Sequence, residues 1–226
     1  MLRKLNLLID GKQYFNLSIC FGVPNTNTEL DEMYRLRYRK YREKNYIPEL
    51  ETEADIDQHD MSRKCRYVVA KIDGQIVGSV RLIVDDPLPT ESYCFRFEEP
   101  PSMVNLARDR RAEVSRLVSG SKTKIPEHLI VVGMISCLHD LAVQEGILGG
   151  YLYVKRSLFR ILEFIGIPIH VIENAKMIYD DDYMRGYFYD LHDPAIPAYY
   201  FRDEVGAALM LIMSDGWHGR IRKQWE

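Results

Sequence analysis

After Thr26, apolar residues recur every three or four positions, a spacing that predicts a helix. Thr26 as the N-cap and Glu29 three residues later fit a capping box. One stripe of this helix then carries Leu30, Met33, Tyr34, Arg37, Tyr38 and Tyr41. Arg37 is the anomaly, because a guanidinium that faces inward must meet a carboxylate or a ligand. A snorkelling side chain or a structural ion pair is the alternative.

Two alternating segments, 65–70 and 75–84, predict strands, and Asp73-Gly74 between them predicts a tight hairpin turn. Arg81 falls on the face opposite Val80 and Leu82, which makes it a second candidate for an inward-facing arginine. Residues 112–118 predict a third strand. Its alternation puts Val114, Arg116 and Val118 on one face and Glu113, Ser115 and Leu117 on the other.

The remaining pattern predicts a helix from Pro126 to Gly146, then a strand at 150–154, a helix at 157–165 and a strand at 169–172. Strands near 187–191 and 198–202 and a helix at 203–213 are expected after that, with a polar, loosely held tail from about 217. This order indicates one α/β (α+β) domain over residues 1–226, built on a mixed sheet with helices on both faces.

Composition narrows the function classes. The 226 residues are 46% hydrophobic and carry 30 Lys and Arg against 33 Asp and Glu, a net charge of -3, so no global charge argues for nucleic acid. No apolar run reaches the ~18 residues of a membrane span. Four scattered cysteines, without metal-ligand spacing, are expected to be buried free thiols in a cytoplasmic protein.

The densest charge lies in residues 54–60, where Asp55, Asp57, His59 and Asp60 precede an apolar run. Three carboxylates so close together repel one another unless nearby cations neutralise their charge. A metal site is one interpretation of this spacing, and the supply of inward-facing arginines makes it the weaker one. His59 is more simply interpreted as a solvated loop side chain than as a catalyst.

Taken together, these pieces resemble the acyl-homoserine-lactone (autoinducer) synthases and the long-chain N-acyl amino acid synthases of the N-acetyltransferase (GNAT) superfamily. The resemblance spans roughly residues 30 to 120 and rests on an ordered set of short motifs. These are Arg37 with Tyr41, Asp55-x-Asp57-x-x-Asp60, Val77-Gly78-Ser79-Val80-Arg81-Leu82, Phe95, and Glu113-Val114-Ser115-Arg116. It implies a GNAT-like, mainly antiparallel central sheet.

Three departures from the family pattern bear on the substrate. Asp55 stands where Glu is common, Tyr41 where Phe is usual, and Tyr46-Ile47-Pro48 where a Trp is expected. In the lactone-forming enzymes that aromatic pair resembles a platform for S-adenosylmethionine. Its alteration favours the amino acid acylators.

The resemblance implies that an amine attacks an acyl thioester carried by acyl carrier protein or coenzyme A, with no bound cofactor or metal. Glu113 is then the candidate base, directly or through water, as a carboxylate kept ionised near arginines. Ser115, on the same strand face, would orient that water or the thioester. Substrate binding is expected to involve Arg37, Tyr41, Asp55, Asp57, Asp60, Arg81, Phe95 and Arg116. The arginines fit either an internal ion-pair lattice with Asp57, Asp60 and Glu113 or clamps for substrate carboxylate and phosphate.

Residues 116–121 occupy the place of the superfamily's pyrophosphate loop but hold a single glycine, which favours acyl carrier protein over coenzyme A as the donor. Carrier proteins are acidic, and exposed basic residues are candidates for their landing patch. These are Arg35, Arg39, Arg42, Arg108 to Arg111, Lys122 and Lys124. An ordinary solvated surface is the alternative.

Three functions stay open at this point. The first is an N-acyltransferase that makes N-acyl amino acids, and its close variant is an acyl-homoserine-lactone synthase using S-adenosylmethionine. The third, from another class, is a catalytically silent acyl-binding or regulatory module that kept the fold.

Overall fold

The computed structural model describes residues 3–9, 12–62, 64–120, 125–214 and 221–223. Over these residues its centre is a nine-stranded sheet in the order β11-β1-β2-β3-β4-β6-β7-β10-β8. Neighbouring strands are antiparallel except for the parallel pair β6 and β7. The strands are β1 (Arg3–Ile9), β2 (Lys12–Gly22), β3 (Cys65–Ile72), β4 (Gln75–Ile83), β6 (Arg111–Ser119), β7 (Gly149–Lys155), β8 (His170–Val171), β10 (Ala195–Phe201) and β11 (Ile221–Lys223). A separate ribbon pairs β5 (Phe95–Arg96) with β9 (Lys176–Met177).

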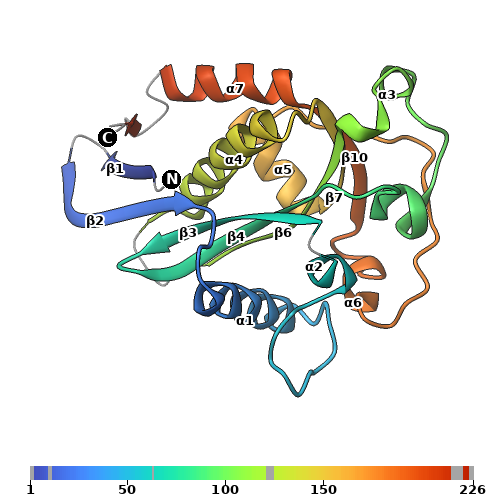
Figure 1. Ribbon diagram of the computed structural model, residues 1–226, viewed down its shortest axis with the longest axis horizontal. Helices are drawn as coiled ribbons and strands as arrows, with labels where there is room; N and C mark the ends of the chain where they lie inside the picture. Colours follow the sequence, from blue (N-terminus) through green and yellow to red (C-terminus); the bar gives the residue numbers. More distant parts are fainter. Residues whose placement is uncertain (1–2, 10–11, 63, 121–124, 215–220, 224–226) are drawn as a thin grey trace.

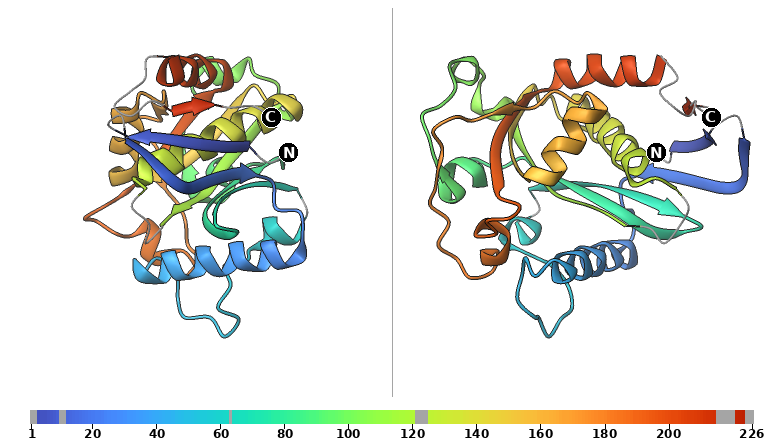
Figure 2. Two further views of the ribbon diagram at one scale, coloured as in Figure 1. Left: turned by 90° about the vertical axis from the view of Figure 1, so that its left-hand side faces the viewer. Right: turned by 180° about the vertical axis from the view of Figure 1, so that it is seen from behind.

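Helices cover both faces of the sheet, as predicted (Figure 1). On one face lies α1, and on the other lie α4 and α5, with α7 packed against α4; the view from behind shows α5 on the α4 side (Figure 2). The longer helices are α1 (Asn27–Glu43), α4 (Glu127–Gln144), α5 (Arg156–Ile165) and α7 (Arg202–Ser214). The short ones are α2 (Gln58–Met61), the π-helical turn η1 (Thr90–Cys94), α3 (Pro101–Val104), the 3₁₀ turn η2 (Arg108–Arg110) and α6 (Arg185–Phe188).

Helix α1 begins at the predicted N-cap. The Thr26 side chain accepts a hydrogen bond from the backbone N–H of Glu29 at 3.1 Å. The Glu29 carboxylate accepts from the N–H of Asn25 instead of closing the capping box on Thr26. The buried stripe includes Met33, Arg37 and Tyr41, so the helical periodicity was correct, the charged position included.

The β3–β4 hairpin turns at Asp73 and Gly74, both with positive φ, as the sequence predicts. The predicted side-chain alternation of β4 fails at its start, because Ala70 pairs with Gly78 while Lys71 pairs with Ile76. Val77 is the extra residue of a bulge, and it packs on the α4 side while Ile76 packs on the α1 side. From Gly78 onward the predicted alternation holds.

Two other expectations need correction or lie mostly outside the described residues. The prediction of a strand near 187–191 was wrong, because this stretch contains α6, where Tyr187 and Phe188 are buried in an aromatic cluster. The expected loose tail from about 217 lies mostly outside the described residues, and its described part, Ile221–Lys223, pairs with β1. The strands β1 and β2 were not predicted.

Within the described part of the chain, no helix is both long enough and apolar enough to cross a bilayer. The four cysteines are free thiols, as expected, with Cys65 and Cys94 buried and Cys20 and Cys137 half-buried.

Candidate active site

The acidic run lies beside the sheet at the end of the loop that follows α1. Asp55 is fully buried, and its backbone N–H donates to the Tyr34 carbonyl. Asp57 caps α2, because its side chain accepts from the N–H groups of His59 and Asp60 while the Asp60 side chain accepts from the N–H of Asp57. This reciprocal cap fixes Asp57 and Asp60 relative to each other.

Arg37 reaches this run from α1. Its Nε donates to Asp55 Oδ2 at 2.7 Å, and its two terminal nitrogens donate to the two oxygens of Asp60 at 3.2 and 2.9 Å. The Arg37 side chain is 1% exposed. The inward-facing arginine predicted from the helical stripe therefore exists, and it meets carboxylates.

Two further arginines arrive from the sheet. Arg81 on β4 binds both oxygens of Asp57 at 2.7 and 2.8 Å and donates from Nε to Ser115 Oγ at 3.0 Å. Arg116 on β6 donates from Nε to Asp55 at 3.0 Å and from Nη2 to Asp57 at 3.1 Å. We call Arg37, Arg81, Arg116, Asp55, Asp57 and Asp60 the Arg/Asp lattice.

Charges in the lattice balance, three against three, and tyrosines complete its hydrogen bonding. Tyr183 Oη donates to Asp55 at 2.6 Å, and Tyr67 Oη donates to Asp60 at 2.8 Å. Burial opposes ionisation of Asp55 most strongly, yet the guanidiniums of Arg116 and Arg37 outweigh it and hold the pKa of this carboxyl well below its usual range. All three carboxylates therefore stay charged at neutral pH.

Arg116 lies on a different face of β6 from the one predicted. Arg81 pairs with Ser115 and Ser79 pairs with Val118, so Arg116 and Leu117 together oppose Val80. Arg116 has a φ of 53°, and this bulge turns its side chain to the face of Ser115. A period of two cannot reveal such a bulge.

Glu113 differs from the expectation of an ionised carboxylate. It is fully buried and takes no part in the lattice; its Oε2 accepts from the Thr90 N–H at 2.7 Å, and its Oε1 has no hydrogen-bond partner among the described residues. Burial raises its pKa to about 8, so it is mostly protonated at pH 7. Arg81 lowers this pKa by less than burial raises it.

An apolar pocket opens where β6 and β7 part. Their parallel pairing ends at Val114 and Leu152, although both strands continue. A cavity of about 100 Å³ lies beyond this point. Its lining includes Leu117, Leu138, Val154, Leu158, Leu162 and Val205, together with Ser115 and Tyr41.

A second pocket, of about 640 Å³, also borders Arg116, and we call it the polar pocket because it holds three carboxylates. Its lining combines carboxylates with aromatic rings: Asp57, Asp180, Asp181, Tyr93, Tyr179 and Tyr183. Arg116 and Tyr153 line both pockets. These two side chains therefore lie between the two pockets, next to the lattice.

Of the two aromatic residues predicted to bind substrate, only Tyr41 lines a pocket. Tyr41 lies under the Arg116 guanidinium, with 5.5 Å from Cζ to the ring centroid, and lines the apolar pocket. Phe95 is buried against Tyr153 and Phe188 and lines neither pocket. Tyr41 thus belongs to the site directly, and Phe95 supports it through Tyr153.

Sequence reasoning missed several residues of the site, most of them tyrosines. Tyr153, which lines both pockets, lies in a predicted strand, and its position next to the parting of β6 and β7 is a tertiary feature. Tyr183 is 128 residues from Asp55 in the chain, so no local pattern links them. The available signal was compositional: the segment after Glu173 is rich in tyrosine.

His59 is not the solvated side chain expected from its loop. It is 7% exposed, and its Nε2 lies 2.9 Å from the Tyr93 hydroxyl. Burial lowers the pKa of this imidazole, so it is neutral at pH 7.

The expected landing patch is only partly exposed. Arg111 is buried, bonded to Glu99 and to the carbonyls of Met103 and Leu106, so it cannot belong to a patch. Arg35, Arg39, Arg108 and Arg110 are exposed, and Arg42 is half-buried and donates to the Ile47 carbonyl. Lys122 and Lys124 lie outside the described residues.

Comparison with known proteins identifies the family to which the sequence belongs. Residues 32–157 match the sequence profile described as N-acyl amino acid synthase FeeM, which is more than half of the chain. No curated protein matches the sequence.

Solved structures share the fold. The crystal structure of TofI in a ternary complex with an inhibitor and MTA superposes with a TM-score of 0.60 at 19% identity, covering 84% of this chain and 96% of that chain. The AHL synthase LasI gives 0.59 at 16% identity, over 92% and 98% of the two chains. FeeM, an N-acyl amino acid synthase from uncultured soil microbes, gives 0.59 at 14% identity, over 88% and 97%.

These likenesses confirm the predicted GNAT-like architecture, and the profile match confirms the family resemblance. The match begins in α1 and ends in the first turn of α5, so it contains every member of the Arg/Asp lattice. The protein belongs to the FeeM family of N-acyl amino acid synthases, enzymes that transfer an acyl group to an amine.

Proposed function

We propose that the protein moves a fatty acyl group from the thioester of an acyl carrier protein to the amine of an amino acid, forming an amide and releasing the thiol. The observation that carries this proposal is that an apolar and a polar pocket share two lining side chains, Arg116 and Tyr153. Acyl transfer requires an apolar chain and a polar nucleophile to approach one carbonyl from two sides.

The acyl chain is assigned to the apolar pocket, with its thioester where β6 and β7 part. The bulge leaves Arg116 and Leu117 without a ladder partner among the described strands. Backbone N–H groups released from a ladder in this way supply donors for the oxyanion of the tetrahedral intermediate.

The amino acid is assigned to the polar pocket, because its ammonium group finds carboxylates there. Asp180 and Asp181 are exposed carboxylates that attract an ammonium group, while Arg116, which also lines this pocket, is already paired with Asp55 and Asp57. S-adenosylmethionine presents the same amino acid group, so a lactone-forming enzyme is the second candidate.

Ser115 lines the apolar pocket to which the thioester is assigned, whereas Glu113 lines neither pocket, so its proposed role requires a linking water. Glu113 would accept, through a water, the proton that the amine nitrogen loses after attack, and Ser115, held by Arg81, would orient that water. Because its pKa is about 8, kcat should rise with pH through that value as Glu113 ionises. Glu113→Gln should lower kcat by roughly 10²-fold or more; full activity of this variant would remove Glu113 from the reaction.

Acyl carrier protein is the proposed donor in preference to coenzyme A, since the segment at the expected place of the pyrophosphate loop has one glycine, Gly120, with the Lys40 ammonium beside it. If docking is electrostatic, charge reversal at Lys122 and Lys124 should raise KM for the carrier protein and weaken its salt dependence. An unchanged KM and an unchanged salt dependence would remove these lysines from the interface.

Mass spectrometry of lipid extracts from an overexpressing bacterial host separates the candidates. N-acyl amino acids are the expected product, and acyl lactones, which base hydrolyses, would favour the second candidate. Acyl thioester bound without turnover, in protein shown to be folded, would favour the silent acyl-binding module.

A further inference from the structure

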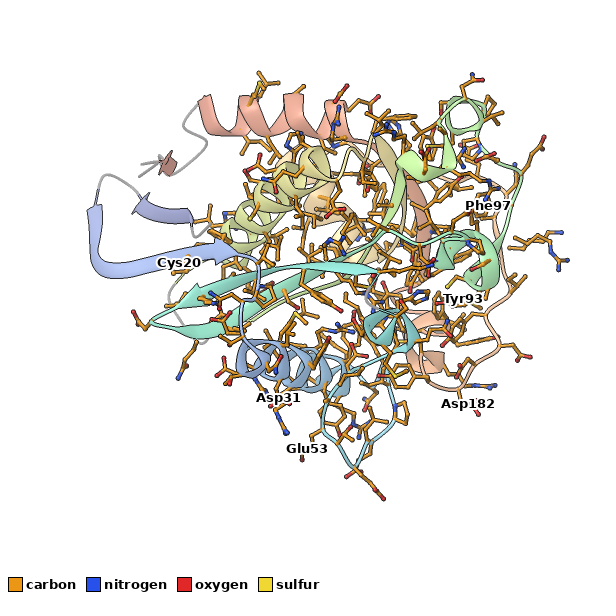
Figure 3. The ribbon with its side chains drawn as sticks, in the orientation of Figure 1. Cys20, Asp31, Glu53, Tyr93, Phe97 and Asp182 are labelled. Atoms are coloured by element: carbon orange, nitrogen blue, oxygen red, sulfur yellow. The ribbon has the colours of Figure 1, made fainter. Side chains whose placement is uncertain are left out.

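A histidine–tyrosine pair joins the polar pocket to the interior of the protein. The Tyr93 hydroxyl lies 2.9 Å from His59 Nε2, and their rings stack at an interplanar angle of 11°. Tyr93 lines the polar pocket, whereas His59 is buried behind it. Figure 3 places Tyr93 at the end of the molecule occupied by the segment that carries Asp182.

The cap of α2 fixes the position of His59. Its backbone N–H donates to Asp57, and its carbonyl accepts from Cys65 Sγ and Ser62 Oγ. The Gln58 side-chain amide lies 3.5 Å from Nε2. The imidazole therefore has little freedom to leave Tyr93.

Charges of both signs face the imidazole. Asp57, Asp60 and Asp85 favour its protonated form, and Arg81 on β4 opposes that form. Burial has the largest effect and lowers the pKa of His59 below its ordinary value of 6.5. At neutral pH the ring is free to accept a proton, and the nearby carboxylates stabilise the imidazolium that results.

We propose that Tyr93 and His59 form the path by which the acceptor ammonium in the polar pocket loses its first proton. This inference rests on the proposed function. The ammonium gives a proton to Tyr93 Oη while the Tyr93 hydroxyl gives its own proton to His59 Nε2. The products are a neutral amine, whose lone pair attacks the thioester carbon, and an imidazolium, which returns its proton to solvent after turnover.

The other acids and bases of the site are less suited to this step. The lattice carboxylates are held by guanidiniums, and their lowered pKa values make them weak bases. Glu113 lines neither pocket and is mostly protonated at pH 7. An ammonium that becomes an amide nitrogen loses two protons, so a base near the amine and a base near the thioester have separate tasks.

His59→Gln and Tyr93→Phe test the path. Glutamine can keep a hydrogen bond to Tyr93 but cannot carry a proton at neutral pH, and phenylalanine keeps the ring without the hydroxyl. His170→Gln and Tyr199→Phe are matched controls, because both residues lie outside the two pockets. Thiol release from acyl carrier protein gives kcat at each pH, and melting temperatures report folding.

The path predicts a fall in kcat of about 10²- to 10³-fold in both test variants and little change in both controls. In the wild type kcat should fall as pH drops through a value below 6.5, and this inflection should be absent from His59→Gln. Folded test variants with wild-type kcat, or an inflection that persists in His59→Gln, would overturn the path while leaving the proposed function intact. A wild-type protein that releases no thiol would overturn both.

Discussion

Asp55→Asn removes one negative charge from the centre of the Arg/Asp lattice and nearly preserves its shape. The wild-type carboxylate is fully buried and accepts hydrogen bonds from Arg37 Nε, Arg116 Nε and Tyr183 Oη at 2.7, 3.0 and 2.6 Å. The asparagine amide has one acceptor oxygen for these three donors. The variant therefore leaves three buried guanidiniums facing two carboxylates.

Breaking a buried ion pair by removing one partner costs about 3–5 kcal/mol, because the remaining charge is left uncompensated. A protein of this size loses about 2–4 °C of melting temperature per kcal/mol. We therefore expect Asp55→Asn to lower the melting temperature by roughly 6–20 °C. Since total stabilities are about 5–15 kcal/mol, this variant should still fold at 25 °C in most of that range.

Urea unfolding followed by circular dichroism measures the free energy, and a thermal scan gives the midpoint. Asp31→Asn is the matched control: its carboxylate pairs with Arg35 on the exposed outer side of α1 at 2.9 Å (Figure 3). That variant should leave the midpoint essentially unchanged, since exposed pairs contribute little. If Asp55→Asn were as stable as the control, the lattice would not hold this part of the fold together.

Three further changes have defined outcomes. Because folding lowers the pKa of Asp57, this carboxylate contributes its full stabilisation above its unfolded pKa of about 3.9 and loses it as pH falls toward the lower folded value. Urea titrations from pH 7 to 2 should show this decline in unfolding free energy, and a flat profile would contradict it. Gly150→Ala would put a Cβ 1.7 Å from the Ala112 carbonyl oxygen, so we expect a loss of about 3 kcal/mol or more in unfolding free energy, and wild-type stability would refute this close approach. Lys155→Met removes a hydrogen bond of 2.6 Å from a buried ammonium to the Tyr187 carbonyl and should cost about 1.5–3 kcal/mol by the same assay, whereas a gain in stability would show that burying the charge costs more than the bond contributes.

Much of the site was predictable where one element decides the direction of a side chain. Arg37 follows from a helical stripe and Arg81 from a strand whose alternation holds after Gly78. In both cases an arginine at a buried position required a carboxylate partner, and the acidic run at residues 55–60 provides the carboxylates. Local periodicity and charge balance were therefore sufficient for these residues.

The remainder depends on tertiary structure. Arg116 faces the site because a bulge breaks the side-chain alternation of β6. The residue type at this position does not predict its backbone φ of 53°. Tyr187 has high β propensity, yet packing against Tyr41 and Tyr46 places it in a short helix. Glu113 was expected to be ionised by nearby arginines, but burial depends on how deeply the surrounding elements cover it.

Reconstitution with purified components tests whether the protein transfers an acyl group from acyl carrier protein to an amino acid. Palmitoyl acyl carrier protein and a ¹⁵N-labelled amino acid mixture would be incubated with the protein, and the products identified by mass spectrometry. The expected products are N-acyl amino acids that carry the label in an amide, formed in step with thiol release. Free fatty acid without labelled amide, or a thioester that stays intact, would contradict this transfer.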